Sequence, residues 1–275
     1  MGKIKINLSG VPETMLWPLY NRGCEQKRTD RLLEDPMALE LMEQIDYDYK
    51  KNFGKNNAGH PLRSRLFDDA IKTWLKQNPT GTVISLGEGL DTQFWRVDNG
   101  LLTWISLDVQ EAIEVRKRFL PTHERVKNIA CSALESNWIK EIPQNQPVFI
   151  VLAGVIMYFT ESDAKKLLSL IADYFYKSEI IFDMISEGYS QKTMKGIKIT
   201  SSYQAPPMPW GLNYKKSKTL ENIHPAIKIK QQMSFLDFYP ERMRPYSYFR
   251  KIKWIKNNLA PWMIHLSIDK NKMNI

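Results

Sequence analysis

The stretch VISLGEGLDTQFWR, residues 83–96, constrains the fold of this chain more than any other. Within it, the short apolar run TVISL (82–86) leads directly into Gly87 and Gly89. A run that is apolar on both faces is typical of a strand inside a parallel sheet. Glycine lacks a Cβ, so it permits a tight turn and lets a ligand approach the backbone. The stretch therefore predicts an α/β sheet with a ligand-binding turn at the carboxyl end of its first strand.

Strand-like and helix-like segments alternate after this turn. Helical patterns are clearest at 109–120 and 161–175, and the further strand candidates are LLTWISLD (101–108), RVKNIACS (125–132), VFIVLAGV (148–155) and EIIFDMIS (179–186). Such alternation is typical of a parallel sheet with helices on both faces. We therefore predict an α/β fold with a doubly wound, Rossmann-like, mostly parallel sheet.

The flanking segments have other patterns. Apolar residues recur at helical spacing in 12–45 and 63–77, and a polar connection, 46–60, lies between them. After Ser186 the alternation fades, and we interpret 187–235, which contains the proline-rich QAPPMPWG, as an insertion or lid. A late helix and a last strand are then expected at 247–259 and 262–269.

The 275 residues, 43% of them hydrophobic, suit one domain with a sizeable core. We expect a single domain over 1–275, made of an N-terminal helical cap (1–62), a cofactor-binding core (63–186) and a lid with the final sheet elements (187–275). Nothing in the sequence specifies an oligomeric state.

Composition excludes several other classes of protein. The longest apolar run, VFIVLAGVIMYF at 148–159, has 12 residues, whereas a membrane-spanning helix needs about 20. The first residues lack the apolar core of a signal peptide. Cys24 and Cys131 form no CxxC motif, and we interpret them as reduced thiols of a cytoplasmic protein. No cluster of histidines or cysteines has the spacing of a metal site.

Positive charge is concentrated in the last third of the chain. Residues 191–275 hold 16 Lys and Arg against 4 Asp and Glu, a net charge of +12, whereas residues 1–190 hold 23 against 26, a net charge of −3. A basic face can attract nucleic acid. Because the basic residues are scattered, we favour a solvated surface over a nucleic-acid site.

The glycine turn favours one cofactor over another. A dinucleotide-binding turn has a third small residue at its sixth position, but this chain has Thr92 there, preceded by Asp91. We expect the carboxylates of Glu88 and Asp91 to repel a pyrophosphate. They would not repel the ammonium and sulfonium groups of S-adenosylmethionine, which is therefore the predicted cofactor.

Other residues have suitable places for the rest of this cofactor. Asp108 ends the second strand, where an acid can accept hydrogen bonds from the ribose hydroxyls. Arg63 precedes the first strand and can reach the methionine carboxylate, and Ser132 and Ala133 follow the third strand, on the adenine side. Alternatively, Asp108 is a helix cap and Arg63 a solvated surface arginine.

The chain also resembles the leucine carboxyl methyltransferase family and its bacterial relatives in polyketide synthesis, which are class I S-adenosylmethionine-dependent enzymes. The similarity runs from about residue 10 to 186 and is carried by GVPETMLWPLYNRG (10–23), DPMALELMEQIDYDY (35–49), RSRLFDD (63–69), LGEGLDTQFWRVD (86–98), LDVQEAIEVRKRF (107–119) and VIMYF (155–159). The resemblance implies that the cofactor is bound by Arg63, Gly87, Gly89, Asp108, Ser132 and Ala133. It also implies that Tyr20, Arg22 and Tyr158 lie on the acceptor side.

Two positions depart from the family pattern. The fourth strand usually ends in an acid followed by glycine, but here the pair is Ala153-Gly154. Ser132 stands where eukaryotic members have Asp, and Glu135 is a candidate replacement for one of these acids. Loss of one carboxylate hydrogen bond costs about 1–3 kcal/mol, so we expect a weakened cofactor site.

The acceptor is less constrained by the sequence. A carboxylate acceptor needs no general base, whereas a hydroxyl acceptor does. No histidine lies in a motif, and His60 is expected in an exposed loop. Aromatic residues of the last third could line an acceptor pocket or pack a cap: Tyr203, Trp210, Tyr214, Phe235, Phe238 and Tyr239. The leading hypothesis is an O-methyltransferase that acts on a carboxylate or hydroxyl of a small molecule. The alternatives are methylation of a protein C-terminus, a degenerate cofactor-binding fold and a nucleic-acid-binding protein.

Overall fold

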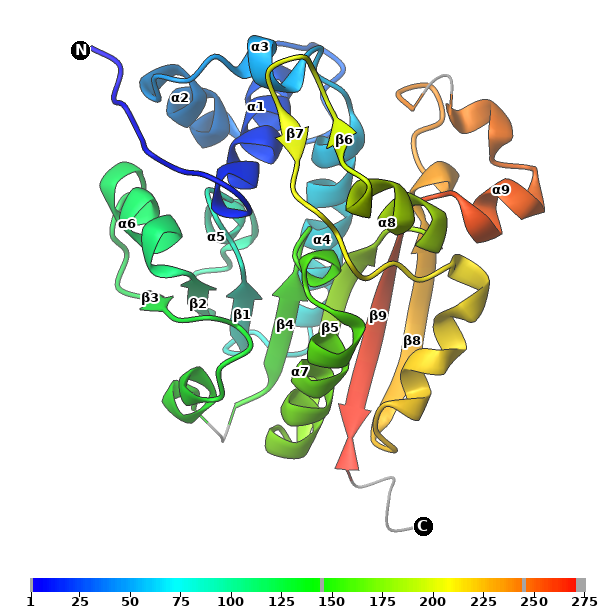
Figure 1. Ribbon diagram of the computed structural model, residues 1–275. Helices are drawn as coiled ribbons and strands as arrows, with labels where there is room; N and C mark the ends of the chain where they lie inside the picture. Colours follow the sequence, from blue (N-terminus) through cyan, green and yellow to red (C-terminus); the bar gives the residue numbers. More distant parts are fainter. Residues whose placement is uncertain (1, 144–145, 244–245, 271–275) are drawn as a thin grey trace.

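A computed structural model describes residues 2–143, 146–243 and 246–270 and contains one large sheet (Figure 1). Its strand order is β3-β2-β1-β4-β5-β9-β8. The bounds are β1 Thr82–Leu86, β2 Thr103–Asp108, β3 Val126–Ala130, β4 Val148–Leu152, β5 Lys177–Met184, β8 Ile227–Ser234 and β9 Trp262–Asp269. Strands β1 to β5 are parallel, and β9 is antiparallel to both β5 and β8. The predicted doubly wound, mostly parallel sheet is confirmed.

Helices cover both faces of this sheet. They are α1 Leu16–Glu25, α2 Pro36–Gln44, α3 Tyr49–Phe53, α4 Gly59–Leu75, α5 Gln93–Val97, α6 Gln110–Phe119, α7 Glu161–Tyr174, α8 Glu187–Met194 and α9 Lys253–Asn258. The 3₁₀ segments are η1 Pro12–Met15, η2 Asn137–Glu141, η3 Ile156–Tyr158, η4 Tyr214–Asn222, η5 Phe235–Asp237 and η6 Tyr246–Phe249. A small hairpin consists of β6 (Ile197–Lys198) and β7 (Gln204–Ala205).

Two hydrophobic cores lie on opposite faces of the sheet because side chains alternate along each strand. In β1, Ile84 and Leu86 pack in the core that contains α7, whereas Val83 packs in the core that contains α4 and α5. All five residues of β1 are buried, as expected for a central strand of a parallel sheet.

The strand order reverses at β1, which pairs with β2 on one side and β4 on the other. In open α/β sheets, ligands bind outside the carboxyl ends of the strands at this switch point. The N-terminal helices and the β6–β7 hairpin lie over these carboxyl ends (Figure 1). The fold thus places the glycine turn beneath a cover made of two segments that are far apart in the sequence.

Three sequence-based expectations need correction. The supposed irregular lid 187–235 contains β8, an edge strand whose mostly polar, partly exposed residues hide the strand pattern. The polar connection 46–60 contains α3 and the start of α4. The late helix at 247–259 is split into η6 and α9. Within the described part of the chain, no helix combines the length and apolar character needed to cross a bilayer.

Candidate functional site

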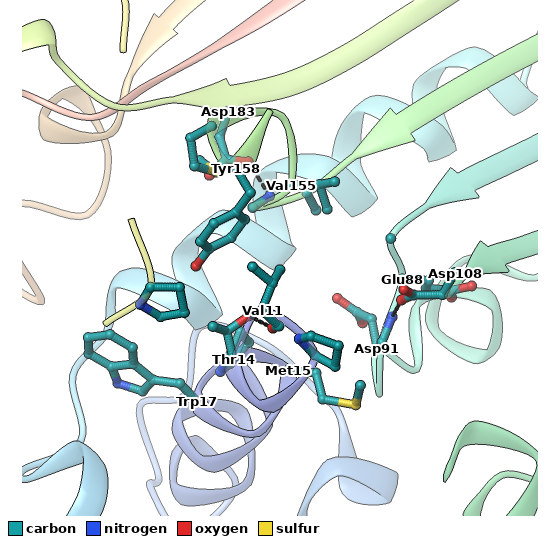
Figure 2. A pocket seen from close by; sticks show the side chains of 18 of the residues that line it. Val11, Thr14, Met15, Trp17, Glu88, Asp91, Asp108, Val155, Tyr158 and Asp183 are labelled. Atoms are coloured by element: carbon teal, nitrogen blue, oxygen red, sulfur yellow. Dashed lines mark hydrogen bonds between the residues drawn. The ribbon is translucent and has the colours of Figure 1, made fainter. Parts of the chain in front are cut away.

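A cavity of about 360 Å³ lies at the carboxyl ends of the central strands. This volume is within the range of small-molecule sites. Figure 2 shows Asp91 and Asp108 on one side of the cavity, and Asp183 and Tyr158 across from the helical segment that carries Thr14 and Trp17. Every site residue predicted from the sequence except Tyr20 contributes to the lining, so the sheet brings together Arg22, Arg63, Gly87, Gly89, Asp108, Ser132, Ala133 and Tyr158.

The turn after β1 requires glycine at two positions. Gly87 has φ +66° and Gly89 has φ +55°, both in the left-handed region. A Cβ on Gly87 would lie 2.6 Å from Cγ2 of Val155, and a Cβ on Gly89 would lie 2.7 Å from Cβ of Met15. Backbone conformation and close packing therefore both exclude a side chain here.

The Asp108 carboxylate holds this turn and still has capacity for a ligand. Its Oδ2 accepts a hydrogen bond from the backbone N–H of Gly89 at 2.7 Å, and its Oδ1 accepts one from Val109 at 2.8 Å. Because each carboxylate oxygen has two acceptor sites, one remains on each oxygen for a pair of ribose hydroxyls. Burial raises the pKa of Asp108, while the two N–H groups act in the opposite direction.

The acids of the glycine turn are compensated by arginines. Glu88 forms an ion pair with Arg116 at 3.0 Å, and Asp91 forms ion pairs with Arg96 at 2.8 Å and Arg22 at 3.5 Å. Burial alone would raise the pKa of Asp91, but the nearby arginines lower it well below its ordinary value. The arginines therefore offset part of the negative charge that was expected to repel a pyrophosphate, and Arg22 and Arg96 are shared with two further acids, Asp35 and Asp68.

Two residues predicted for the acceptor side have other contacts. The Arg22 guanidinium is 1% exposed and forms an ion pair with Asp35 at 2.9 Å, so it ties α1 to the glycine turn. The Tyr20 hydroxyl donates to the carbonyl of Gly54 at 3.2 Å, and its ring stacks on Tyr49, away from the cavity. Arg22 lies at the edge of the lining, and Thr14, Trp17 and Pro18 also line the cavity from the N-terminal segment.

Arg63 extends from α4 to the cavity and meets an acid that the sequence analysis missed. Its Nη1 lies 3.4 Å from Oδ2 of Asp183, near the end of β5. The other oxygen of Asp183 accepts a hydrogen bond from the backbone N–H of Gly154 at 2.5 Å. Both side chains line the cavity, whereas Glu135, the candidate replacement acid, does not. The sequence signal that could have identified Asp183 is an acid near the carboxyl end of a predicted parallel strand.

Ser132 and Ala133 lie beside Asp108, as predicted. The N–H of Cys131 donates to the carbonyl of Asp108 at 2.9 Å, so the segment after β3 is joined to the end of β2. Cys131, Ser132 and Ala133 all line the cavity. This arrangement is suitable for an adenine next to a ribose held by Asp108.

The opposite end of the cavity is rich in aromatic and apolar side chains. Burial raises the pKa of Tyr158, whose hydroxyl interacts with Thr14. From the last third of the chain, Tyr189, Tyr203, Pro206 and Met208 reach the cavity. The other predicted aromatics pack in or against the hydrophobic cores instead: Trp210, Tyr214, Phe235, Phe238 and Tyr239.

His60 is not an exposed loop residue, contrary to expectation. It lies in the first turn of α4, lines the cavity and packs edge-on against Trp17. Its Nδ1 is 2.6 Å from Nδ2 of Asn21, and Oδ1 of Asn21 accepts a hydrogen bond from the N–H of Asn57. The Asn57 N–H fixes the amide orientation, so Nδ1 of His60 is the acceptor and Nε2 carries the proton. Burial, with help from Arg63 and Arg22, lowers the pKa of His60 well below 6.5.

Among the described residues, no group of three or more His, Cys, Asp or Glu side chains is arranged to hold a metal ion. The polar end of the cavity instead fits S-adenosylmethionine. It offers a glycine cradle that a Cβ would fill, an acid with two free acceptor sites and a guanidinium whose buried Nε has no partner among the described residues.

Comparisons with known proteins agree with this geometry. The family model of leucine carboxyl methyltransferase matches residues 16–172. The chain is 28% identical to the tetracenomycin polyketide synthesis O-methyltransferase TcmP of Streptomyces glaucescens, over 84% of this chain and 86% of that protein. It is 24% identical to the S-adenosyl-L-methionine-dependent methyltransferase dpfgK of Gibberella zeae, over 87% of each chain.

Among solved structures, the small RNA methyltransferase HEN1 matches with a TM-score of 0.50 and 9% identity, over 75% of this chain and 25% of that one. This match shows a shared fold alone. It agrees with the predicted fold class. The family match and the two sequence relatives confirm the methyltransferase activity and the cofactor S-adenosylmethionine. The chain belongs to the leucine carboxyl methyltransferase family.

Proposed function

We propose that this enzyme transfers the methyl group of S-adenosylmethionine to a carboxylate or hydroxyl oxygen of a small molecule. The observation that carries the proposal is the two-ended cavity. Its polar end contains the glycine turn, Arg63 and Asp108, and its aromatic end is covered by the N-terminal segment and the β6–β7 region. A covered, largely apolar end suits a compact acceptor better than an extended protein tail.

Each site residue has a role in this proposal. Gly87 and Gly89 give the methionine end close access to the backbone, Asp108 binds the ribose hydroxyls, and Ser132 and Ala133 border the adenine. Arg63 binds the methionine carboxylate. Tyr158 lies on the acceptor side and helps to orient the nucleophilic oxygen. The bound cofactor supplies an electrophilic methyl group, and the protein contributes mainly by holding the acceptor oxygen in line with it.

The state of His60 favours a carboxylate acceptor. Its Nδ1 is occupied by Asn21, and its Nε2 carries a proton, so the neutral ring donates a hydrogen bond and does not act as a base through Nε2. A hydroxyl acceptor must lose its proton to a base, whereas a carboxylate is already ionised at neutral pH. The relative TcmP, an O-methyltransferase of polyketide synthesis by name, further supports an oxygen acceptor on a small molecule.

An acceptor panel tests this proposal. Aromatic carboxylic acids and the phenols of matching skeleton are incubated with S-adenosylmethionine, and formation of S-adenosylhomocysteine is measured from pH 6 to 9. We expect turnover with carboxylic acids at a rate that varies little with pH, and its loss in Asp108→Ala. Methylation of a peptide C-terminus, with none of the small acids or phenols accepted, would contradict the proposal.

A cytoplasmic location stays a prediction from the sequence.

A further inference from the structure

Arg63 and Asp183 form an ion pair that faces the cavity, a position that a purely structural ion pair would not require. Both side chains line the cavity next to the glycine turn, with Arg63 12% and Asp183 9% exposed. Gly154, at φ +74°, lies so close to Arg63 that an added Cβ would be 2.3 Å from Nη1. The guanidinium therefore reaches the cavity by passing directly under the backbone at the end of β4.

The sheet register places Asp183 beside the position where an acid is missing. Leu152 of β4 pairs with Phe182 of β5 in parallel register. Ala153 and Asp183 are the next residues on each strand, and both line the cavity. The carboxylate that β4 lacks is therefore present at the same level on the neighbouring strand.

The ionic contacts of Asp183 differ from those of Asp91, which also lines the cavity. Asp91 has two arginine partners, one of them at 2.8 Å. Asp183 has a longer ionic contact, 3.4 Å to Arg63, and its Oδ1 is held by the N–H of Gly154. The backbone bond fixes the carboxylate in place, and its Oδ2 has capacity for a further donor.

We propose that Asp183 binds the α-ammonium group of S-adenosylmethionine, next to the methionine carboxylate held by Arg63. The end of the methionine moiety is a zwitterion with one ammonium and one carboxylate. A carboxylate and a guanidinium side by side at the cavity wall are its charge complement. The ammonium also supplies the additional donors that Asp183 can accept.

This assignment changes the expected effect of Ala153. The cofactor site retains an acid for the ammonium group, so the lack of a carboxylate on β4 does not weaken binding. The proposal concerns the cofactor alone and holds whichever acceptor is methylated, so its failure is distinguishable from failure of the proposed function.

A double-mutant cycle between protein and ligand tests the assignment. Binding of S-adenosylhomocysteine and of its analogue without the α-amino group is measured by calorimetry on the wild type and on Asp183→Asn. The substitution keeps the shape of the side chain and its acceptor oxygen for Gly154 but removes its charge. Asp98→Asn is the matched control, because Asp98 is also ion-paired with an arginine, Arg125, but does not line the cavity. Thermal unfolding verifies that each variant is folded.

For the wild type and Asp98→Asn, we expect the amino group to increase affinity about 10- to 100-fold, as for a charge-assisted hydrogen bond. For Asp183→Asn, the two ligands should bind with affinities within about threefold of each other. If removal of the amino group costs the same factor in Asp183→Asn as in the wild type, Asp183 does not contact the ammonium and the assignment is wrong. If Asp183→Asn binds both ligands equally weakly and no longer unfolds cooperatively, Asp183→Glu is measured in its place. In Asp183→Glu, the ligand that carries the amino group should again bind more tightly.

Discussion

At the scale of single residues, the glycine turn is the feature on which both the fold and cofactor binding depend most directly. Gly89 donates its N–H to Asp108 and packs on Met15, so one position connects the acid of β2 to the N-terminal segment. Any side chain here must adopt a left-handed backbone and displace Met15 as well.

We predict that Gly89→Ala weakens binding of S-adenosylhomocysteine at least about 10-fold and lowers the free energy of unfolding by about 2–4 kcal/mol, because strain and overpacking add. Calorimetry and urea denaturation measure the two effects. Gly100→Ala is a matched control, since Gly100 has φ +81° with no atom within 4 Å of an added Cβ. It should lose about 1 kcal/mol of stability and bind normally. Equal binding losses in both variants would refute the close-approach argument.

Prediction from the sequence correctly located the residues at strand ends, whereas their part in cofactor binding stays a prediction. Asp108 and Gly87 follow predicted strands, and parallel strands bring their carboxyl ends to one edge of the sheet. It failed for Tyr20, because the face of a helix that meets the cavity depends on how α1 packs, which its sequence does not determine. Asp183 was missed because it lies inside the predicted strand segment EIIFDMIS (179–186), whereas the strand itself ends at Met184.

At the scale of elements, a buried charge network fastens the N-terminal helices to the core. Asp35 caps α2 through the N–H of Ala38 and also accepts from Thr92 at 2.6 Å. Its carboxylate forms ion pairs with Arg22 at 2.9 Å and Arg96 at 3.0 Å. One carboxylate thus connects α1, α2 and the segment that follows the glycine turn.

We predict that Asp35→Ala lowers the free energy of unfolding by about 3–5 kcal/mol, because it leaves two buried guanidinium groups short of a partner and removes a helix cap. Asp69→Ala, which breaks an exposed pair with Arg65, should cost less than about 1 kcal/mol. Both are measured by urea denaturation. A cost for Asp35→Ala no larger than that of Asp69→Ala would show that the network does not hold the N-terminal segment.

Most elements could be predicted because the central strands are apolar on both faces and the long helices are amphipathic. Strand β8 could not, since an edge strand with residues such as Lys228 and Gln231 has no continuous apolar run. Its place in the sheet depends on pairing with β9, about 30 residues later in the chain, which no local pattern indicates.

At the scale of the whole molecule, the excess positive charge and the charged side chains of the cavity lie in different parts of the chain. The net charge of +12 in residues 191–275 comes from scattered side chains, whereas the acids and arginines of the cavity come largely from residues 1–190 and compensate one another. The division into cap, core and lid remains a prediction. The cavity nevertheless takes residues from all three of these ranges, so cofactor and acceptor sites depend on the entire chain.

The central claim is that the cavity at the carboxyl ends of β1 and β2 holds S-adenosylmethionine through Asp108. The most direct test is calorimetric titration with S-adenosylhomocysteine, with NAD as the control ligand and with Asp108→Ala and Asp108→Asn in parallel. We predict a dissociation constant on the order of 1–100 μM for S-adenosylhomocysteine alone, and a loss of at least about 10-fold in both variants. Binding of NAD instead, or unchanged binding of S-adenosylhomocysteine in both folded variants, would contradict this assignment.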